Sequence, residues 1–121
     1  MVSYRTGLGH LGEQIAAQYL IKRGYTLLAS NWRCKGGEID LVARHGSSIV
    51  FVEVRTRRAA SVDTAFESIT PRKRQRLLAA IHTYLAETRL ESEDWRVDII
   101  AVAVRRSSSP IVEHLENGLD W

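Results

Sequence analysis

The stretch from Gly36 to Arg57 most constrains the fold, because it predicts two β-strands joined by a tight turn. Apolar residues alternate with other residues on both sides of Gly46-Ser47, which is the periodicity of a strand. Glycine at the first central position suits a two-residue type II′ turn, and such a turn fixes the register of the hairpin. We therefore expect Val42 to lie opposite Phe51.

The same register brings carboxylates together at the far end of the hairpin. Asp40 is expected opposite Glu53, and Glu38 opposite Arg55. Like charges directly opposite one another destabilise a sheet, so the two facing carboxylates need a compensating charge. The alternation also predicts one apolar face on the first strand, formed by Ile39, Leu41 and Ala43.

Two kinds of compensation fit these acids. A divalent cation such as Mg²⁺ or Mn²⁺ prefers hard oxygen ligands and leaves water and substrate phosphate to complete its coordination shell. Such an ion can activate a water molecule and shield a phosphoryl group. In the alternative, the acids pair with nearby arginines, namely Arg55, Arg57 and Arg96. The residues by themselves leave the metal site and the ion-pair network equally open.

The segments around this hairpin predict helices and strands in a definite order. In chain order we expect a helix from Leu8 that Gly24 closes, a strand over Tyr25–Trp32, a loop over 33–37 and then the central hairpin. After the hairpin we expect a short helical turn over 64–66, a helix that Thr70-Pro71 starts, an apolar strand over Trp95–Val104 and an edge strand over Ile111–Leu115. A meander followed by a strand that is reached through a helix implies an α/β fold with a mixed β-sheet flanked by helices. The length of 121 residues fits a single domain over residues 1–121.

Cysteine usage and hydropathy bear on the compartment. Cys34 is the lone cysteine, so no intrachain disulfide can form, and this fits a reducing cytosol. The N-terminal residues lack the apolar core of a signal peptide, and no apolar run approaches membrane-spanning length. We therefore expect a cytoplasmic protein without a membrane partner.

Basic residues are concentrated in one part of the chain. Of the 17 lysines and arginines, seven lie between Arg55 and Arg76, although the formal net charge is only +3. Four of them occupy the first turns of the second predicted helix, where cations oppose the helix macrodipole unless an anionic partner is present. Such a patch attracts phosphate backbones, and the alternative is an ordinary solvated face. The candidate nucleic-acid-binding residues are Arg57, Arg58, Arg72, Lys73, Arg74 and Arg76.

Short motifs along nearly the whole chain resemble one known family. They are Gly9, Gly12-Glu13, Gly24-Tyr25, Asn31, the blocks GGEIDLVA and VFVEVRTR, Lys73 and Arg96-Val97-Asp98. This pattern resembles the YraN-like family of uncharacterised bacterial proteins. That family is similar to Holliday-junction resolvases and to the wider restriction-endonuclease-like nucleases, which carry an Asp followed by (Asp/Glu)-x-Lys on a hairpin. The resemblance implies a restriction-endonuclease-like α/β core.

The resemblance also implies roles for individual residues. Asp40 matches the Asp of the nuclease motif and Glu53 its second acid, and both are expected to bind Mg²⁺ or Mn²⁺. Glu13 matches the helical Glu that completes the metal site of the resolvases, although spacing alone predicts a solvated helix acid. The partner that the resemblance implies is DNA, and a homodimer is expected because the resolvases act as dimers.

Arg55 departs from the nuclease motif, which has Lys two residues after the second acid. A buried lysine can lose its proton and activate water, whereas an arginine stays charged and can hold phosphate. Arg55 completes the candidate catalytic set with Asp40 and Glu53. We expect a nucleic-acid-binding protein that cuts branched or structured DNA in a metal-dependent reaction. The alternatives are a catalytically inactive nucleic-acid-binding module and a protein-interaction domain with an ion-paired acidic cluster.

Overall fold

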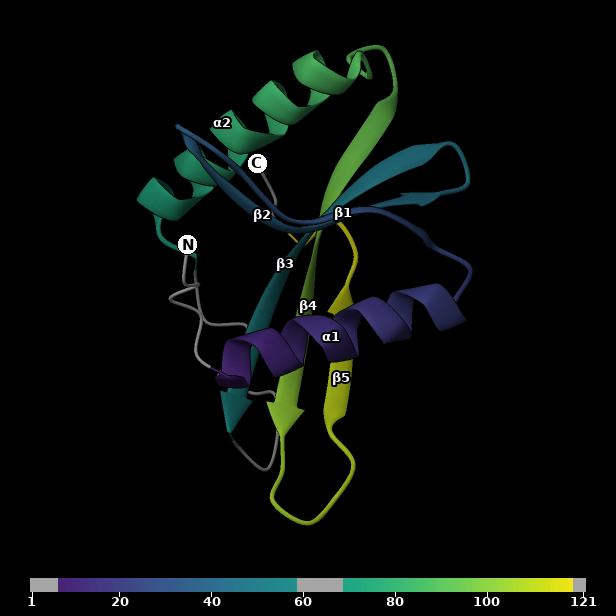
Figure 1. The fold of residues 1–121 in the computed structure, drawn as a ribbon, viewed down its shortest axis with the longest axis vertical. Coiled ribbons are helices and arrows are strands. Elements are labelled where there is room, and N and C mark those ends of the chain that lie inside the picture. The colour runs from purple at the N-terminus through teal and green to yellow at the C-terminus, as the bar shows by residue number, and fades with distance from the viewer. Residues whose placement is uncertain (1–6, 59–68, 119–121) are drawn as a thin grey trace.

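A twisted β-sheet with one helix on each side forms the described part of the protein (Figure 1). The structure is a computed structural model, and it describes residues 7–58 and 69–118. In chain order the elements are α1 (Gly7–Lys22), β1 (Thr26–Cys34), β2 (Gly37–His45), β3 (Ser48–Arg58), α2 (Pro71–Thr88), β4 (Asp94–Val104) and β5 (Ile111–Leu115). The helical turn expected over 64–66 lies outside the described residues.

The sheet has mixed strand directions, as the order of the elements predicted. Its strand order is β1-β2-β3-β4-β5, and its neighbouring strands are antiparallel except for the parallel pair β3 and β4. The helix α2 lies in the connection between these two parallel strands. Val42 lies opposite Phe51, so the register predicted from the Gly46-Ser47 turn is confirmed. The predicted edge strand is confirmed as β5.

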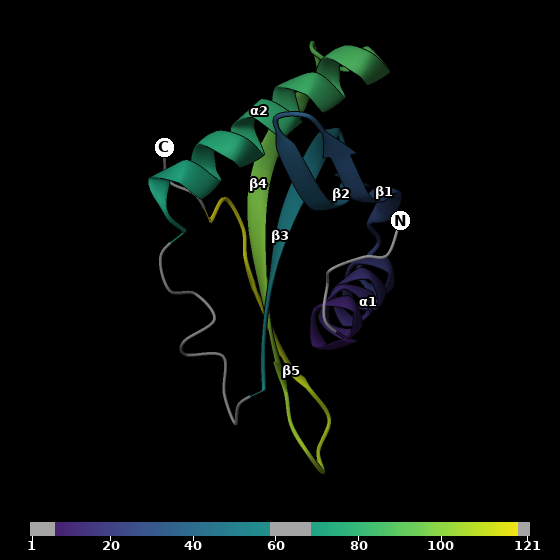
Figure 2. The ribbon, with the colours of Figure 1, turned by 60° about the vertical axis from the view of Figure 1, so that its left-hand side comes forward.

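Each helix buries an apolar cluster against its own face of the sheet (Figure 2). On the α2 side, Phe51 of β3 is fully buried in one cluster with Ile81 and Tyr84. On the α1 side, Leu20 is fully buried in one cluster with Val52. Burying one such side chain contributes about 1.5–3 kcal/mol, so these clusters hold both helices on the sheet. Neither of these two described helices is long and apolar enough to cross a membrane.

The first residues of α2 set where this helix begins, as Thr70-Pro71 predicted. The Thr70 side chain accepts a hydrogen bond of 3.2 Å from the backbone N–H of Lys73. Pro71 occupies the first turn, where the missing N–H of proline leaves no helical hydrogen bond unmade. Because the helix begins here, its cationic first turns lie over β2, with the backbone of Arg76 against Gly37.

The β1–β2 hairpin contains a bend that the sequence did not predict. Asn31 lies across from Asp40, and its backbone is left-handed with a φ of 50°. Asparagine tolerates this conformation better than most residues with a side chain. As a result, Ile39 packs in the cluster under α2, whereas Leu41 and Ala43 pack in the cluster under α1. The predicted common face of these three residues is therefore wrong, because strict alternation holds only along a regular strand.

The connection between β1 and β2 is also shorter than predicted. β1 extends to Cys34 and β2 begins at Gly37, so only two residues remain where a loop over 33–37 was expected. Arg33 pairs with Glu38 in this extension. The hairpin therefore continues through polar residues, which carry no apolar alternation by which a strand could be recognised.

Candidate metal centre

Asp40 lies where β2 separates from β3. The ladder between these strands ends at the pair Leu41 and Val52, so β3 continues beyond this point without β2. Beyond this pair, the side chain of Asp40 contacts the backbone of β3: its Oδ2 accepts a hydrogen bond of 2.8 Å from the backbone N–H of Val54. Asp40 is only 7% exposed. The bond to the backbone therefore fixes the direction of a nearly buried carboxylate.

Glu53 lies beside Asp40, so the predicted proximity of the two acids is confirmed. A side-chain hydrogen bond links the two carboxyl groups. Burial and then the charge of Asp40 raise the pKa of Glu53 from its ordinary value of 4.5 to about 9. The positive charges of Arg55 and Lys73 lower this pKa, but their effect is smaller. Glu53 is therefore protonated at neutral pH as long as no cation compensates the pair.

A cavity of about 170 Å³ opens over the two carboxylates. Its lining residues come from the sheet and from α2, and they are Glu38, Asp40, Glu53, Lys73, Arg76 and Leu77. Two exposed cations of α2 therefore share one space with three acids of the sheet. This volume accommodates several water molecules or a phosphate group.

Two glycines allow the helices to approach the sheet beside this cavity. A Cβ atom at Gly37 would collide with the carbonyl oxygen of Arg76, so glycine permits α2 to lie directly on the start of β2. A Cβ atom at Gly12 would collide with the side chain of Thr56, so α1 lies equally close to β3. Glu13 follows Gly12 and is 5% exposed. The solvated helix acid that spacing alone predicted at Glu13 is therefore wrong.

Two of the three arginines invoked in the ion-pair alternative, Arg57 and Arg96, have other partners. Because the ladder of β2 and β3 ends before Glu38, the expected Glu38–Arg55 register does not form, and Glu38 makes an ion pair of 3.1 Å with Arg33 instead. Arg96 makes an ion pair of 2.9 Å with Asp98. Arg57 donates a hydrogen bond of 2.9 Å to the carbonyl oxygen of Thr56. Arg96 and Arg57 therefore have contacts elsewhere, whereas the charge of Arg55 acts on Glu53, so the ion-pair alternative stays open.

The donor set suits a hard divalent cation. Mg²⁺ is commonly held by one or two carboxylates and completes its coordination shell with water and substrate oxygens. A cation held by Asp40 and Glu53 would keep its other coordination positions free for such oxygens. Within residues 7–58 and 69–118, no three side chains of His, Cys, Asp and Glu gather in a way that could hold a metal ion. The parts of Asp40, Glu53 and Glu13 as metal ligands therefore stay predictions.

Comparison with known proteins places the chain in a family. The uncharacterised protein family UPF0102 matches residues 12–102. A UPF0102 protein of Roseiflexus castenholzii is 49% identical over 117 residues, which cover 95% of this chain and 94% of the relative. The chain belongs to the UPF0102 family. Other UPF0102 proteins are 54% identical over 99 residues in Chloroflexus aurantiacus, covering 81% of this chain and 80% of the relative, and 42% identical over 120 residues in Herpetosiphon aurantiacus, covering 96% of each.

The segment that matches the UPF0102 family contains all the predicted site residues. In this UPF0102 protein, Lys73 and Arg76 line the cavity of the carboxylates. The remaining predicted nucleic-acid-binding residues lie on α2 or at the end of β3, and they are Arg72, Arg74, Arg57 and Arg58. Sequence reasoning missed Arg33, which lines a neighbouring cavity of about 250 Å³ together with Arg76. The sequence signal that could have identified Arg33 is the two-residue turn between β1 and β2, because this turn brings Arg33 opposite Glu38.

Replacing Glu53 with glutamine is expected to stabilise the UPF0102 protein at alkaline pH. Because the pKa of Glu53 is raised to about 9, the folded protein holds a proton that the unfolded chain releases above about pH 4.5. Wild-type stability therefore falls as the pH rises from about 5 to about 9, and Glu53→Gln removes this loss. Thermal unfolding with a chelator present should give a melting temperature about 3–6 °C above wild type at pH 8 and a smaller difference at pH 5.

The matched control for this measurement is Glu91→Gln on the exposed loop before β4. It is expected to leave the melting temperature unchanged at both pH values, because a substitution on the surface usually has little effect on stability. If Glu53→Gln shifted the melting temperature equally at pH 5 and pH 8, the raised pKa of Glu53 would not be the cause of the shift.

Proposed function

We propose that this protein binds nucleic acid through a restriction-endonuclease-like core and cuts branched or structured DNA with Mg²⁺ or Mn²⁺. One observation carries the proposal: Asp40 and Glu53 meet in a cavity that they share with the cations Lys73 and Arg76. A pair of carboxylates can bind a divalent cation, and neighbouring cations can bind the phosphate group of the phosphodiester that is cleaved. In a purely structural role, neither the carboxylate pair nor the neighbouring cations would account for the presence of the other.

Each side chain has a separate part in the proposed site. Asp40 and Glu53 hold the cation, which supplies activation of a water molecule and shields negative charge on the phosphoryl group. Arg76 presents a planar guanidinium that can hold two phosphate oxygens at once, and Lys73 presents a compact charge. The N–H of Val54 orients Asp40, and binding of the cation would replace the proton that Glu53 shares with Asp40.

A second candidate function is nucleic-acid binding without cleavage, and Arg55 is the residue that favours it. Its charge acts on Glu53, so it lies close to the carboxylate pair. An arginine keeps its proton at neutral pH and therefore cannot serve as the base that a lysine provides. The two candidates share the same binding surface and differ only in whether the phosphodiester is broken.

Calorimetric titration with Mn²⁺ is the test of the proposed metal site. Wild type should bind one ion, and Asp40→Asn should weaken the affinity at least about tenfold because one of two charged ligands is lost. The matched control is Glu91→Gln, which removes a carboxylate from an exposed loop. Equal affinities for wild type and Asp40→Asn would refute the metal site and favour the protein-interaction alternative.

A further inference from the structure

A second group of arginines lies at the carboxyl ends of β3 and β4. The parallel pairing of these strands places Arg58 beside Val104, which is the last residue of β4. The next two residues in the chain are also arginines. We call this group the arginine end, and it consists of Arg57, Arg58, Arg105 and Arg106. Positions 54–58 and 99–110, all of them described, contain no acidic residue.

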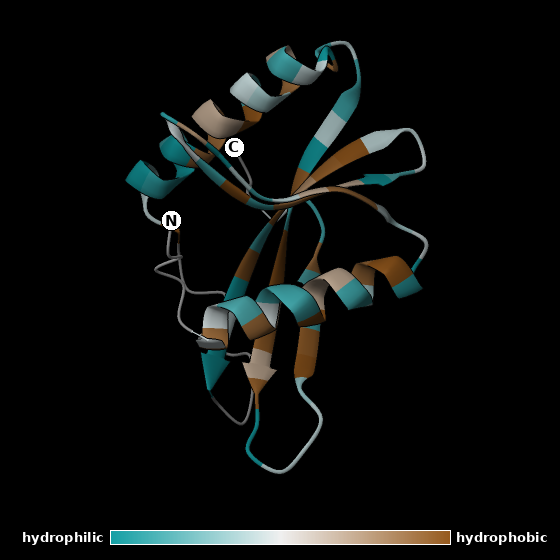
Figure 3. Ribbon diagram, viewed as in Figure 1, coloured by the Kyte–Doolittle hydropathy of each residue, from teal (hydrophilic) through white to brown (hydrophobic). Residues whose placement is uncertain are grey.

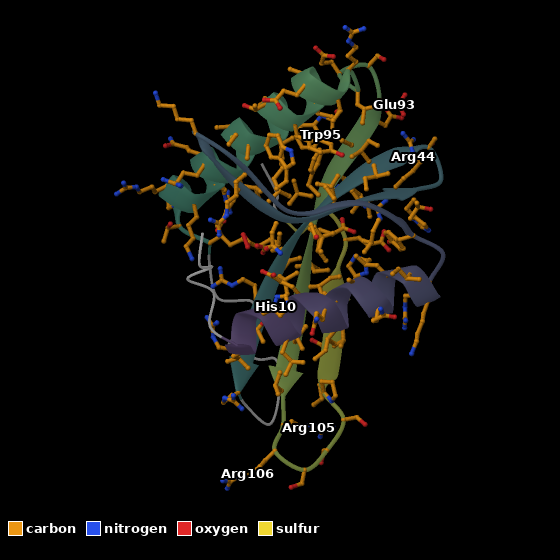
Figure 4. The ribbon with its side chains drawn as sticks, viewed as in Figure 1. His10, Arg44, Glu93, Trp95, Arg105 and Arg106 are labelled. Carbon is orange, nitrogen blue, oxygen red and sulfur yellow. The ribbon has the colours of Figure 1, made fainter. Side chains whose placement is uncertain are left out.

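The loop between β4 and β5, which carries two of these arginines, is held in one shape. Arg105 donates two hydrogen bonds to the carbonyl oxygen of Ser109, at 2.9 Å from Nε and 2.6 Å from Nη2. Arg105 thereby ties one side of the loop to the other. Arg106 is exposed at the outer end of the loop (Figure 4), and Ser107 and Ser108 are exposed beside it. Arginine, serine hydroxyl and free backbone N–H groups are the usual donors to phosphate oxygens.

The arginine end and the cations of α2 lie at different ends of the carboxylate site. Arg57 is four residues after Glu53 on β3 and, by alternation, on the same face of the strand, which corresponds to roughly 13 Å at the rise of a strand. Arg106 lies two residues beyond the level of Arg58, so it is roughly 20–25 Å from Glu53. Figure 3 shows hydrophilic residues at both places, in the first turn of α2 and at the end of β3. One basic surface therefore adjoins the cavity, and the other lies a definite distance from it.

We infer that the arginine end binds the phosphate backbone of a nucleic-acid arm that extends from the carboxylate site, an inference that rests on the proposed function. A double helix rises about 3.4 Å per base pair, so it covers this distance in about 6–7 base pairs. An arm of that length contacts both basic surfaces, whereas a shorter arm contacts only the cations of α2. Phosphate contacts carry no sequence information, so the arm is selected by its length and not by its bases.

Binding to DNA hairpins with stems of about 4 and about 12 base pairs tests this inference. Wild-type affinity at 0.1 M salt should be at least about tenfold higher for the long stem, and Arg57→Ala/Arg106→Ala should remove that gain. The slope of log affinity against log salt for the long stem should become shallower by about 2 units, because two phosphate contacts are lost. The Mn²⁺ titration of this variant should match wild type, which shows that the fold and the carboxylate pair are intact.

The matched control is Lys22→Ala/Arg23→Ala, which removes the same charge from the exposed end of α1 and should keep the gain in affinity. An equal loss in this control, or an unchanged gain in Arg57→Ala/Arg106→Ala, overturns the inference and leaves the proposed function standing. A wild type that binds neither hairpin overturns the proposed function itself. Binding of heparin or anionic vesicles through the arginine end, with no effect on DNA binding, assigns this surface to another polyanion and also overturns the inference.

Discussion

Replacing Asp98 with alanine is expected to lower the free energy of unfolding by about 3–5 kcal/mol, which is typical of breaking a buried charge network. Asp98 is 0% exposed. It accepts hydrogen bonds from Arg96 Nε at 2.9 Å and from the backbone N–H of Asn117 at 3.0 Å. His114 Nε2 lies 2.7 Å from its second oxygen. Removing the carboxylate leaves Arg96 and His114 without the acceptor around which they are arranged.

The pH dependence of the same network provides a second readout. Burial alone would raise the pKa of Asp98, but hydrogen bonds from His114, Arg96 and the backbone outweigh it and lower the pKa below the ordinary 3.8. The stabilisation by Asp98 is therefore present above about pH 4 and is lost as the pH falls below that value. Urea unfolding at pH 7 and at pH 3 measures both effects. Asp94→Ala, at the exposed start of β4, is the control and should cost less than about 0.5 kcal/mol. A loss below 1 kcal/mol in Asp98→Ala would show that the network is not a principal source of stability.

The sequence was sufficient for those parts of the fold that short-range signals determine. The Gly46-Ser47 turn set the register of β2 and β3, and Thr70-Pro71 marked the beginning of α2. Both signals act within a few residues, because turn geometry and helix capping depend on local backbone conformation. The proximity of Asp40 and Glu53 followed from the same turn, because the hairpin register brings residues 40 and 53 to the same level.

Features that depend on the path of a strand or on distant pairing could not be predicted in this way. The left-handed backbone of Asn31 in β1 and the change of face between Ile39 and Leu41 in β2 leave no sign in residue alternation. The parallel register of β3 and β4 is set by how α2 packs and not by a turn, so the neighbourhood of Arg58 and Arg106 appears only in the structure. Burial of Glu13 depends in the same way on the close approach of α1 at Gly12.

Replacing Arg55 with lysine is expected to raise the single-turnover rate of DNA cleavage about 100-fold while leaving binding unchanged. Alternation along β3 puts residue 55 on the same face as Glu53, and its charge acts on that carboxylate. Arginine there stabilises negative charge, but an arginine side chain stays protonated near neutral pH and therefore cannot act as a base. A lysine that is buried beside a bound cation can lose its proton, and general-base catalysis contributes about 10²–10⁴ in rate.

The measurement is cleavage of junction, flap and duplex DNA with Mg²⁺ or Mn²⁺, at enzyme in excess over substrate, for wild type and Arg55→Lys. Wild type should bind branched DNA and cut it slowly or not at all. Arg23→Lys is the matched control, because it makes the same exchange at an exposed position after α1, outside the residues proposed to bind the metal or the nucleic acid. Its cleavage rate should equal that of wild type. Fast cleavage by wild type that falls in Arg55→Lys would show that arginine is the functional choice. If both proteins bind DNA and neither cuts it, the chain belongs to the non-catalytic alternative. The lack of a general base at residue 55 would then not be the reason why DNA is not cleaved.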